Sequence, residues 1–149
     1  DTANSLNNLA SLYDSLGDAG SIIVYNQSFE SSRIQELAEM FPKYKEWAKK
    51  VTKRMVDLLI PFRNFYYYNP SQKGSASIKK VLPAVTGKSY SDLEIRGGEA
   101  AANEYLRAMH DVKVSAAEKN DILHALEEYC KRDTEGMIWI LEKLRGMVE

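Results

Sequence analysis

The sequence has 149 residues, 44% of them hydrophobic, which is enough apolar side chain to bury the core of one domain. Its 20 basic and 21 acidic residues leave a net charge of −1, which excludes an overall basic footprint for nucleic acid, and no apolar run approaches the roughly 20 residues of a membrane helix. We therefore expect a single domain over 1–149, and the lone Cys130 is typical of a reducing cytoplasm.

The first third of the chain predicts two helices separated by a strand. Leucines spaced three and four positions apart predict a helix over 6–16 that ends at Gly17. The run "SIIVYN" at 21–26 is apolar and β-branched, which is typical of a strand buried on both faces of a sheet. A second helical pattern covers 29–41 and stops at Pro42.

Shorter signals follow in the middle of the chain. Apolar spacing predicts a third helix over 44–59, and the aromatic run "NFYYY" at 64–68 predicts a second strand. We further expect a helix over 75–84 with Ser75 or Ser77 at its start, a weak strand "DLEI" at 92–95, and an Ala-rich helix over 98–110.

The longest helical signal ends the sequence. Ser115 and Glu118 form the pattern of a capping box, and apolar residues then recur at helical spacing as far as Leu144. A break near 131–134 is compatible with a pattern of this length. Cys130 falls on the inner face and is expected to be a small core residue.

The predicted strands are too few for a stable parallel sheet. The sheet is expected to be completed by residues that precede this sequence or by a partner molecule. An unpaired sheet edge also invites a second copy, so a dimer through this edge is a further expectation. Two His and one Cys leave an all-protein zinc site without enough ligands.

Two carboxylates lie where chemistry is expected. Glu30 follows the end of the buried strand, where open α/β sheets place their sites, and Asp133 lies on the apolar stripe of the last helix, one turn after Tyr129. A pair of such carboxylates suits Mg²⁺ or Mn²⁺. The alternatives are that Glu30 only stabilises a helix terminus, and that Asp133 is a hydrogen-bonded core residue or the cap of a new helix.

Three stretches carry a resemblance to a known family. "YCKRD" at 129–133 and "YNQSFE" at 25–30 resemble the third and second motifs of the tyrosine-type DEDD 3′–5′ exonucleases, which have an RNase H-like (DnaQ-like) fold. The middle of the chain, including "GSASIKKVLP" at 74–83, resembles an uncharacterised bacterial family of unknown function, DUF2779, distantly related to those exonucleases. The resemblance implies a helix-dominated, partial RNase H-like α/β fold that lacks its first strands.

The resemblance also implies a reaction and a set of residues. The reaction is metal-dependent hydrolysis of phosphodiester bonds at single-stranded ends of DNA or RNA, with two Mg²⁺ or Mn²⁺ ions. Glu30 and Asp133 would be metal ligands, and Tyr129 would orient the attacking water. Asn26 would lie near the substrate, and Ser77 and Lys79 would contact phosphate, since lysines and helix N-termini attract anions.

The sequence departs from that family in two places. Glu30 stands where the family usually has Asp, and the first motif, Asp-x-Glu on the first strand, is absent before Ser21. We therefore expect an N-terminally truncated domain that is inactive by itself, and whether the longer protein is an enzyme stays open. The alternatives are a degenerate fold that binds nucleic acid or protein without chemistry, and a plain helical interaction module.

Overall fold

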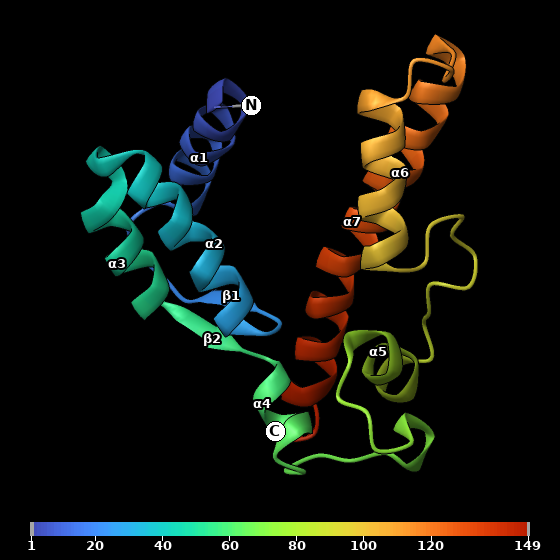
Figure 1. Cartoon of the computed structure of the whole chain (residues 1–149). Coiled ribbons are helices and arrows are strands. Elements are labelled where there is room, and N and C mark those ends of the chain that lie inside the picture. The colour runs from blue at the N-terminus through green and yellow to red at the C-terminus, as the bar shows by residue number, and fades with distance from the viewer. Residues whose placement is uncertain (1, 149) are drawn as a thin grey trace. The chain divides into compact units, whose positions relative to one another are not determined.

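The computed structural model describes residues 2–148, with the side chains of residues 5–148. The chain forms two compact units, Asp1–Asn64 and Phe65–Glu149 (Figure 1). Helices dominate both units, and the strands among the described residues form one small parallel sheet. The predicted class, helix-dominated α/β with a small sheet, is confirmed. The RNase H-like assignment and the single domain over 1–149 stay predictions.

The first unit is built around a parallel strand pair that two helices connect. Ile22 pairs with Met55, and Val24 pairs with Asp57. The elements in chain order are α1 (Thr2–Leu16), β1 (Ile22–Val24), α2 (Gln27–Met40), the 3₁₀ turn η1 (Pro42–Tyr44), α3 (Lys45–Lys53), β2 (Met55–Asp57) and α4 (Leu59–Arg63).

One face of this sheet is covered and the other is open. Successive side chains of a strand point to opposite faces, so Val24 and Met55 share one face and Val56 points to the other. Val24 and Met55 are buried, whereas Val56 is 46% exposed. Residues of α1, α2 and α3 complete the core on the covered face: Leu9, Ile34, Ala38, Trp47, Ala48 and Val51.

Arg54 joins the first helix to the sheet. Its guanidinium group donates hydrogen bonds to the backbone oxygens of Leu16, Gly17, Ala19 and Gly20. The last carbonyls of a helix have no partners within the helix. One planar side chain therefore fixes the end of α1 and the loop that leads into β1.

Three helices form most of the second unit (Figure 1). The elements are the 3₁₀ turn η2 (Pro70–Gln72), α5 (Ile78–Thr86), α6 (Gly98–His110) and α7 (Ala116–Arg145). Helices α5 and α6 both pack against α7. Gly136 of α7 lies at the contact with α5, since a Cβ there would be 3.2 Å from a methyl group of the fully buried Leu82. The glycine lets the two helices approach closely.

The predicted helix over 44–59 is too long. It stops at Lys53, and Met55–Asp57 forms strand β2 because it pairs with β1, more than 30 positions earlier in the chain.

Two of the predicted strands are wrong. The run 64–68 forms a turn, in which Phe65 has the left-handed φ of 56° and cannot continue a strand. The segment 92–95 is irregular, although Leu93 and Ile95 are buried.

Several helix boundaries also differ from the predictions. Helix α5 begins after Ser77, one of the two serines expected at its start, and α7 runs through 131–134 without a break. Ser115 accepts a hydrogen bond from the backbone N–H of Glu118, which is one half of the predicted capping box, whereas the carboxylate of Glu118 accepts a hydrogen bond from Arg107. Cys130 is exposed on α7, so the prediction that it lies in the core is wrong.

Within residues 2–148, no helix has both the length and the apolar character of a membrane span.

Candidate functional site

The end of β1 carries two of the predicted residues. Asn26 is the N-cap of α2 with a left-handed backbone (φ 76°), which Asn tolerates better than most residues, and its side chain makes no capping hydrogen bond. Instead the Oδ1 of Asn26 accepts a hydrogen bond from the hydroxyl of Ser28 at 2.8 Å. Glu30 lies in the first turn of α2, as predicted, and partial burial of its carboxyl group raises its pKa.

Asp57, for which the sequence predicted no role, caps α2. Its Oδ1 accepts hydrogen bonds from the backbone N–H groups of Asn26 (2.8 Å) and Leu59 (2.9 Å), and its Oδ2 accepts one from Gln27 (3.0 Å). Asp57 is 9% exposed, and burial beside its carboxylate raises the pKa of Tyr25. A buried carboxylate here is satisfied by backbone donors and the positive end of a helix.

A hollow of about 360 Å³ lies beside this cap. Its wall contains hydroxyls of α2 and the guanidinium group of Arg63, but not Glu30. The lining residues are Gln27, Ser28, Ser31, Asp57, Ile60 and Arg63. In this unit the structural role of Glu30, stabilisation of a helix terminus, accounts for its position.

The second unit brings the predicted Tyr129 and Asp133 together with a third residue, Tyr90. The hydroxyl of Tyr90 donates a hydrogen bond to Oδ1 of Asp133 at 2.5 Å, and the rings of Tyr90 and Tyr129 lie 6.1 Å apart between centroids. Both tyrosines are buried. Burial and the nearby Asp133 carboxylate raise the pKa of Tyr129 to about 12 and also raise the pKa of Tyr90. Both hydroxyls therefore keep their protons at neutral pH.

Lys79 and two glycines complete this cluster. The ammonium nitrogen of Lys79 lies 5.9 Å from the centroid of the Tyr129 ring, within the range of a cation–π contact. A Cβ added to Gly97 would lie 3.1 Å from that nitrogen, and one added to Gly98 would lie 3.8 Å from the Tyr129 hydroxyl. The predicted Ser77 is the exposed N-cap of α5, and its side chain makes no capping hydrogen bond.

The segment that carries Tyr90 is tied to α7 at the neighbouring position as well. Arg132 donates two hydrogen bonds to the carboxylate of Asp92, at 2.8 and 2.7 Å, and a third to the backbone oxygen of Ser89. These hydrogen bonds from Arg132 lower the pKa of Asp92 to about 2. Arg132 and Asp133 thus hold the segment 89–92 from consecutive positions of one helix.

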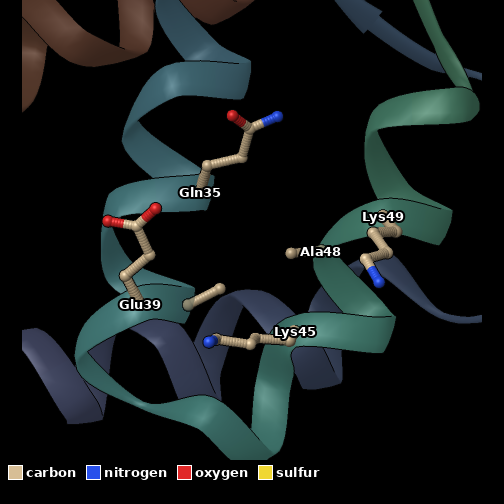
Figure 2. A pocket seen from close by; sticks show the side chains of 6 residues that line it. Gln35, Glu39, Lys45, Ala48 and Lys49 are labelled. Carbon is tan, nitrogen blue, oxygen red and sulfur yellow. The ribbon is translucent and has the colours of Figure 1, made fainter.

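Another hollow, of about 260 Å³, lies between α2 and α3 (Figure 2). Glu39 comes from α2, and Lys45 and Ala48 come from the facing helix α3 (Figure 2). Its lining residues are Gln35, Ala38, Glu39, Lys45, Ala48 and Lys49. None of them was predicted as a site residue, and the charged side chains here are those of an ordinary solvated helix pair.

The predicted site residues thus divide between the two units. Tyr129, Asp133 and Lys79 come together in the second unit, whereas Asn26 and Glu30 belong to the first. Within the described part of the chain, no group of three His, Cys, Asp or Glu side chains could hold a metal ion.

Comparison with known proteins defines the family. The fold and the cluster describe a helix-dominated α/β protein with a tyrosine–aspartate pair on its last helix. Residues 1–77 match the family described as "Domain of unknown function (DUF2779)", and the chain belongs to this family. No solved structure matches the chain.

The relatives found are themselves uncharacterised and much longer. The uncharacterized protein MG366 of Mycoplasma genitalium is 28% identical over 93% of this chain and 22% of its own length. The uncharacterized protein UU173 of Ureaplasma parvum is 26% identical over 87% of this chain and 21% of its own length. A homolog of MG366 in Mycoplasma pneumoniae is 28% identical over 87% of this chain. The chain spans about a fifth of the length of these relatives.

Proposed function

We propose that this chain is part of a metal-dependent nuclease-like domain of the RNase H-like class, which hydrolyses phosphodiester bonds at the ends of single-stranded DNA or RNA in the cytoplasm. The observation that carries the proposal is the cluster of Tyr129, Asp133 and Lys79. It joins the tyrosine and the aspartate of the "YCKRD" motif to a cation from another helix. Glu30 is the proposed contribution of the first unit.

The proposed roles follow from the chemistry of each group. A bound divalent ion would supply an activated water and charge stabilisation, and Asp133 would be one of its ligands. Asp133 keeps one carboxylate oxygen that no hydrogen bond from Tyr90 occupies. Tyr129 stays protonated near neutral pH and can donate to a water or a phosphate oxygen. Lys79 supplies a positive charge for the phosphate.

A second candidate function is binding of nucleic acid or protein without catalysis. The hydrogen bond from Tyr90 favours it, because this bond already gives the Asp133 carboxylate a partner within the same unit. The same hydrogen bond is expected in a degenerate site in which Asp133 only stabilises the fold. The two functions therefore need an experiment that separates cleavage from binding.

The test uses the full-length protein that contains this chain. End-labelled single-stranded DNA and RNA are incubated with it in Mg²⁺ or Mn²⁺, and with chelator. We expect shortening of the labelled strands that chelator and Asp133→Asn abolish and that Tyr129→Phe reduces about 10- to 100-fold. Asp121→Asn, an exposed acid of the same helix, is the matched control. Retention of nucleic acid without any cleavage would favour the binding function.

A further inference from the structure

A hollow of about 360 Å³ lies on the second unit where α5 ends, and the indole ring of Trp139 forms part of its wall. Trp139 is half-buried, and Val85 adds a buried apolar side chain to the same wall. No residue of the predicted site lines this hollow. Its lining residues are Val85, Thr86, Lys88, Trp139, Glu142 and Lys143.

One lysine lies over the indole ring and a second lines the same hollow. The Nζ of Lys88 lies 4.3 Å from the centroid of the ring of Trp139, and Lys143 lines the same hollow. Neither lysine takes part in a salt bridge within residues 2–148. Glu142 is the single acid of the lining. The hollow therefore combines an aromatic face with two positive charges that have no carboxylate partner among the described residues.

The position of Lys88 is fixed at its base. Helix α5 ends with Gly87 in the left-handed conformation (φ 75°), and the hydroxyl of Thr86 accepts a hydrogen bond from the backbone N–H of Lys88 at 3.1 Å. The chain therefore leaves α5 in a defined direction, while the long side chain of Lys88 keeps its own rotational freedom. Lys88 can move its ammonium group from the ring to a bound anion without a change in the backbone.

This hollow lies on a different side of α7 from Asp133. An α-helix turns by about 100° per residue, so Trp139 is rotated by about 120° from Asp133 and lies almost in line with Arg132, seven positions earlier. Arg132 is engaged with Asp92 and Ser89. The surface around Trp139 is thus separate from the cluster of Tyr129 and Asp133.

We propose that Trp139, Lys88 and Lys143 form a second binding site for a single-stranded nucleic acid, with one base stacked on the indole and adjacent phosphates at the two ammonium groups. Aromatic faces accept any base, and lysines bind the backbone without regard to sequence. The site rests on the proposed function only in that the ligand is a nucleic acid. It requires neither a metal ion nor catalysis, so it can be tested in chelator.

The test measures tryptophan fluorescence of the Trp47→Phe chain, in which Trp139 is the remaining tryptophan. The indole N–H of Trp47 has no hydrogen-bond partner, so the replacement removes no hydrogen bond. The probe is a single-stranded oligothymidylate of about 12 nucleotides at low salt, within the range that one binding module covers. We expect saturable quenching of Trp139, because a base stacked on the indole ring quenches its emission.

Side-chain replacements then assign the binding. Affinity, measured by anisotropy of a labelled strand on the unmutated background, is expected to fall at least about fivefold in Trp139→Leu and to be largely kept in Trp139→Phe. Lys88→Gln and Lys143→Gln should weaken binding and reduce its salt dependence, whereas Lys113→Gln, which removes an exposed charge between α6 and α7, should not. Circular dichroism checks that each variant is folded.

The proposal is overturned if Trp139 emission does not respond to the strand, if Trp139→Leu binds as well as the unmutated chain, or if Lys113→Gln weakens binding as much as Lys88→Gln. Absence of cleavage by the full-length protein, with quenching of Trp139 in this chain, would instead remove the nuclease function and leave this site standing. The two proposals thus fail separately.

Discussion

Tyr90 donates a hydrogen bond of 2.5 Å to Asp133 across 43 positions of the chain. Tyr90 is 5% exposed, so its hydroxyl has little access to water and depends on this carboxylate. This hydrogen bond holds Oδ1 of Asp133 in place, and Oδ2 accepts no hydrogen bond from Tyr90. In the proposed nuclease, Tyr90 is therefore a positioning residue for the aspartate of the "YCKRD" motif.

Replacement of Tyr90 by Phe tests this relationship through stability. The variant keeps the ring but removes the donor of the 2.5 Å hydrogen bond to Asp133, and we expect a loss of about 1–3 kcal/mol in the free energy of unfolding, because hydrogen bonds to charged groups are stronger than neutral ones. Urea denaturation followed by circular dichroism gives the value. Tyr105→Phe, at a tyrosine of α6 that is 48% exposed, is the control and should cost almost nothing. Equal stability of Tyr90→Phe and the unmutated chain would contradict the assignment.

The cap at α2 gives a prediction for the first unit. Asp57→Ala leaves three backbone N–H groups without their acceptor, and we expect a loss of about 2 kcal/mol or more in stability, at the upper end of the cost of losing a helix cap. Asp57→Asn should cost less, since an amide oxygen still accepts. Asp18→Asn, in the exposed loop before β1, is the matched control. Hydrogen exchange at the amides of Asn26 and Gln27 localises the effect, and unchanged protection there would argue against the cap.

The fold could be predicted from the sequence only where an element is determined by residues close to it in the chain. The long helix α7 and its first turn at Ser115 follow from nearby residues, and their prediction is confirmed. Strand β2 was missed because Val51, Met55 and Leu58 have helical spacing, and only pairing with β1 makes Met55 part of a strand. The tyrosines at 66–68 have strand propensity, but the chain turns at the left-handed Phe65 just before them.

The candidate site was also predictable only where its residues are close to one another in the sequence. Tyr129 and Asp133 lie one turn apart, so their proximity follows from helix geometry alone. The contact of Lys79 with Tyr129 does not follow from spacing, since the packing of α5 on α7 produces it. Nothing in the sequence near Tyr90 indicates that it contacts Asp133. Asp57 follows two apolar residues, but that pattern does not indicate that it caps α2. Nonlocal packing therefore supplied the partners of both carboxylates.

The close contact between α5 and α7 at Gly136 gives a prediction for stability. Ala has the higher helix propensity by about 1 kcal/mol, but its methyl group would meet a fully buried Leu82 at 3.2 Å. Overpacking of a core costs about 1–3 kcal/mol, so Gly136→Ala should lower the stability on balance. In a Leu82→Val background the same substitution should cost less, since the shorter side chain leaves room for the added methyl group. Gly136→Ala that stabilises the unmutated chain would show that this contact is loose.

The pair of Arg132 and Asp92 predicts a pH dependence. The pKa of Asp92 is lowered from 3.8 to about 2, so the pair stabilises the folded chain above pH 4 and loses its effect as the pH falls toward 2. Asp92→Asn should therefore be less stable than the unmutated chain near pH 7, and the difference should vanish near pH 2. Asp92 is exposed, so added salt should shrink the difference. A difference that persists at low pH would contradict the role of the pair.

The most direct test of the proposed nuclease function compares the full-length protein that contains this chain with its Asp133→Asn variant in Mn²⁺, on one end-labelled single strand. We predict release of labelled nucleotides by the unmutated protein and none by the variant, while both retain strand binding at Trp139 in chelator. Equal cleavage by the two proteins, or equal lack of cleavage with the strand fully bound, would contradict the proposal that Asp133 supports phosphodiester hydrolysis.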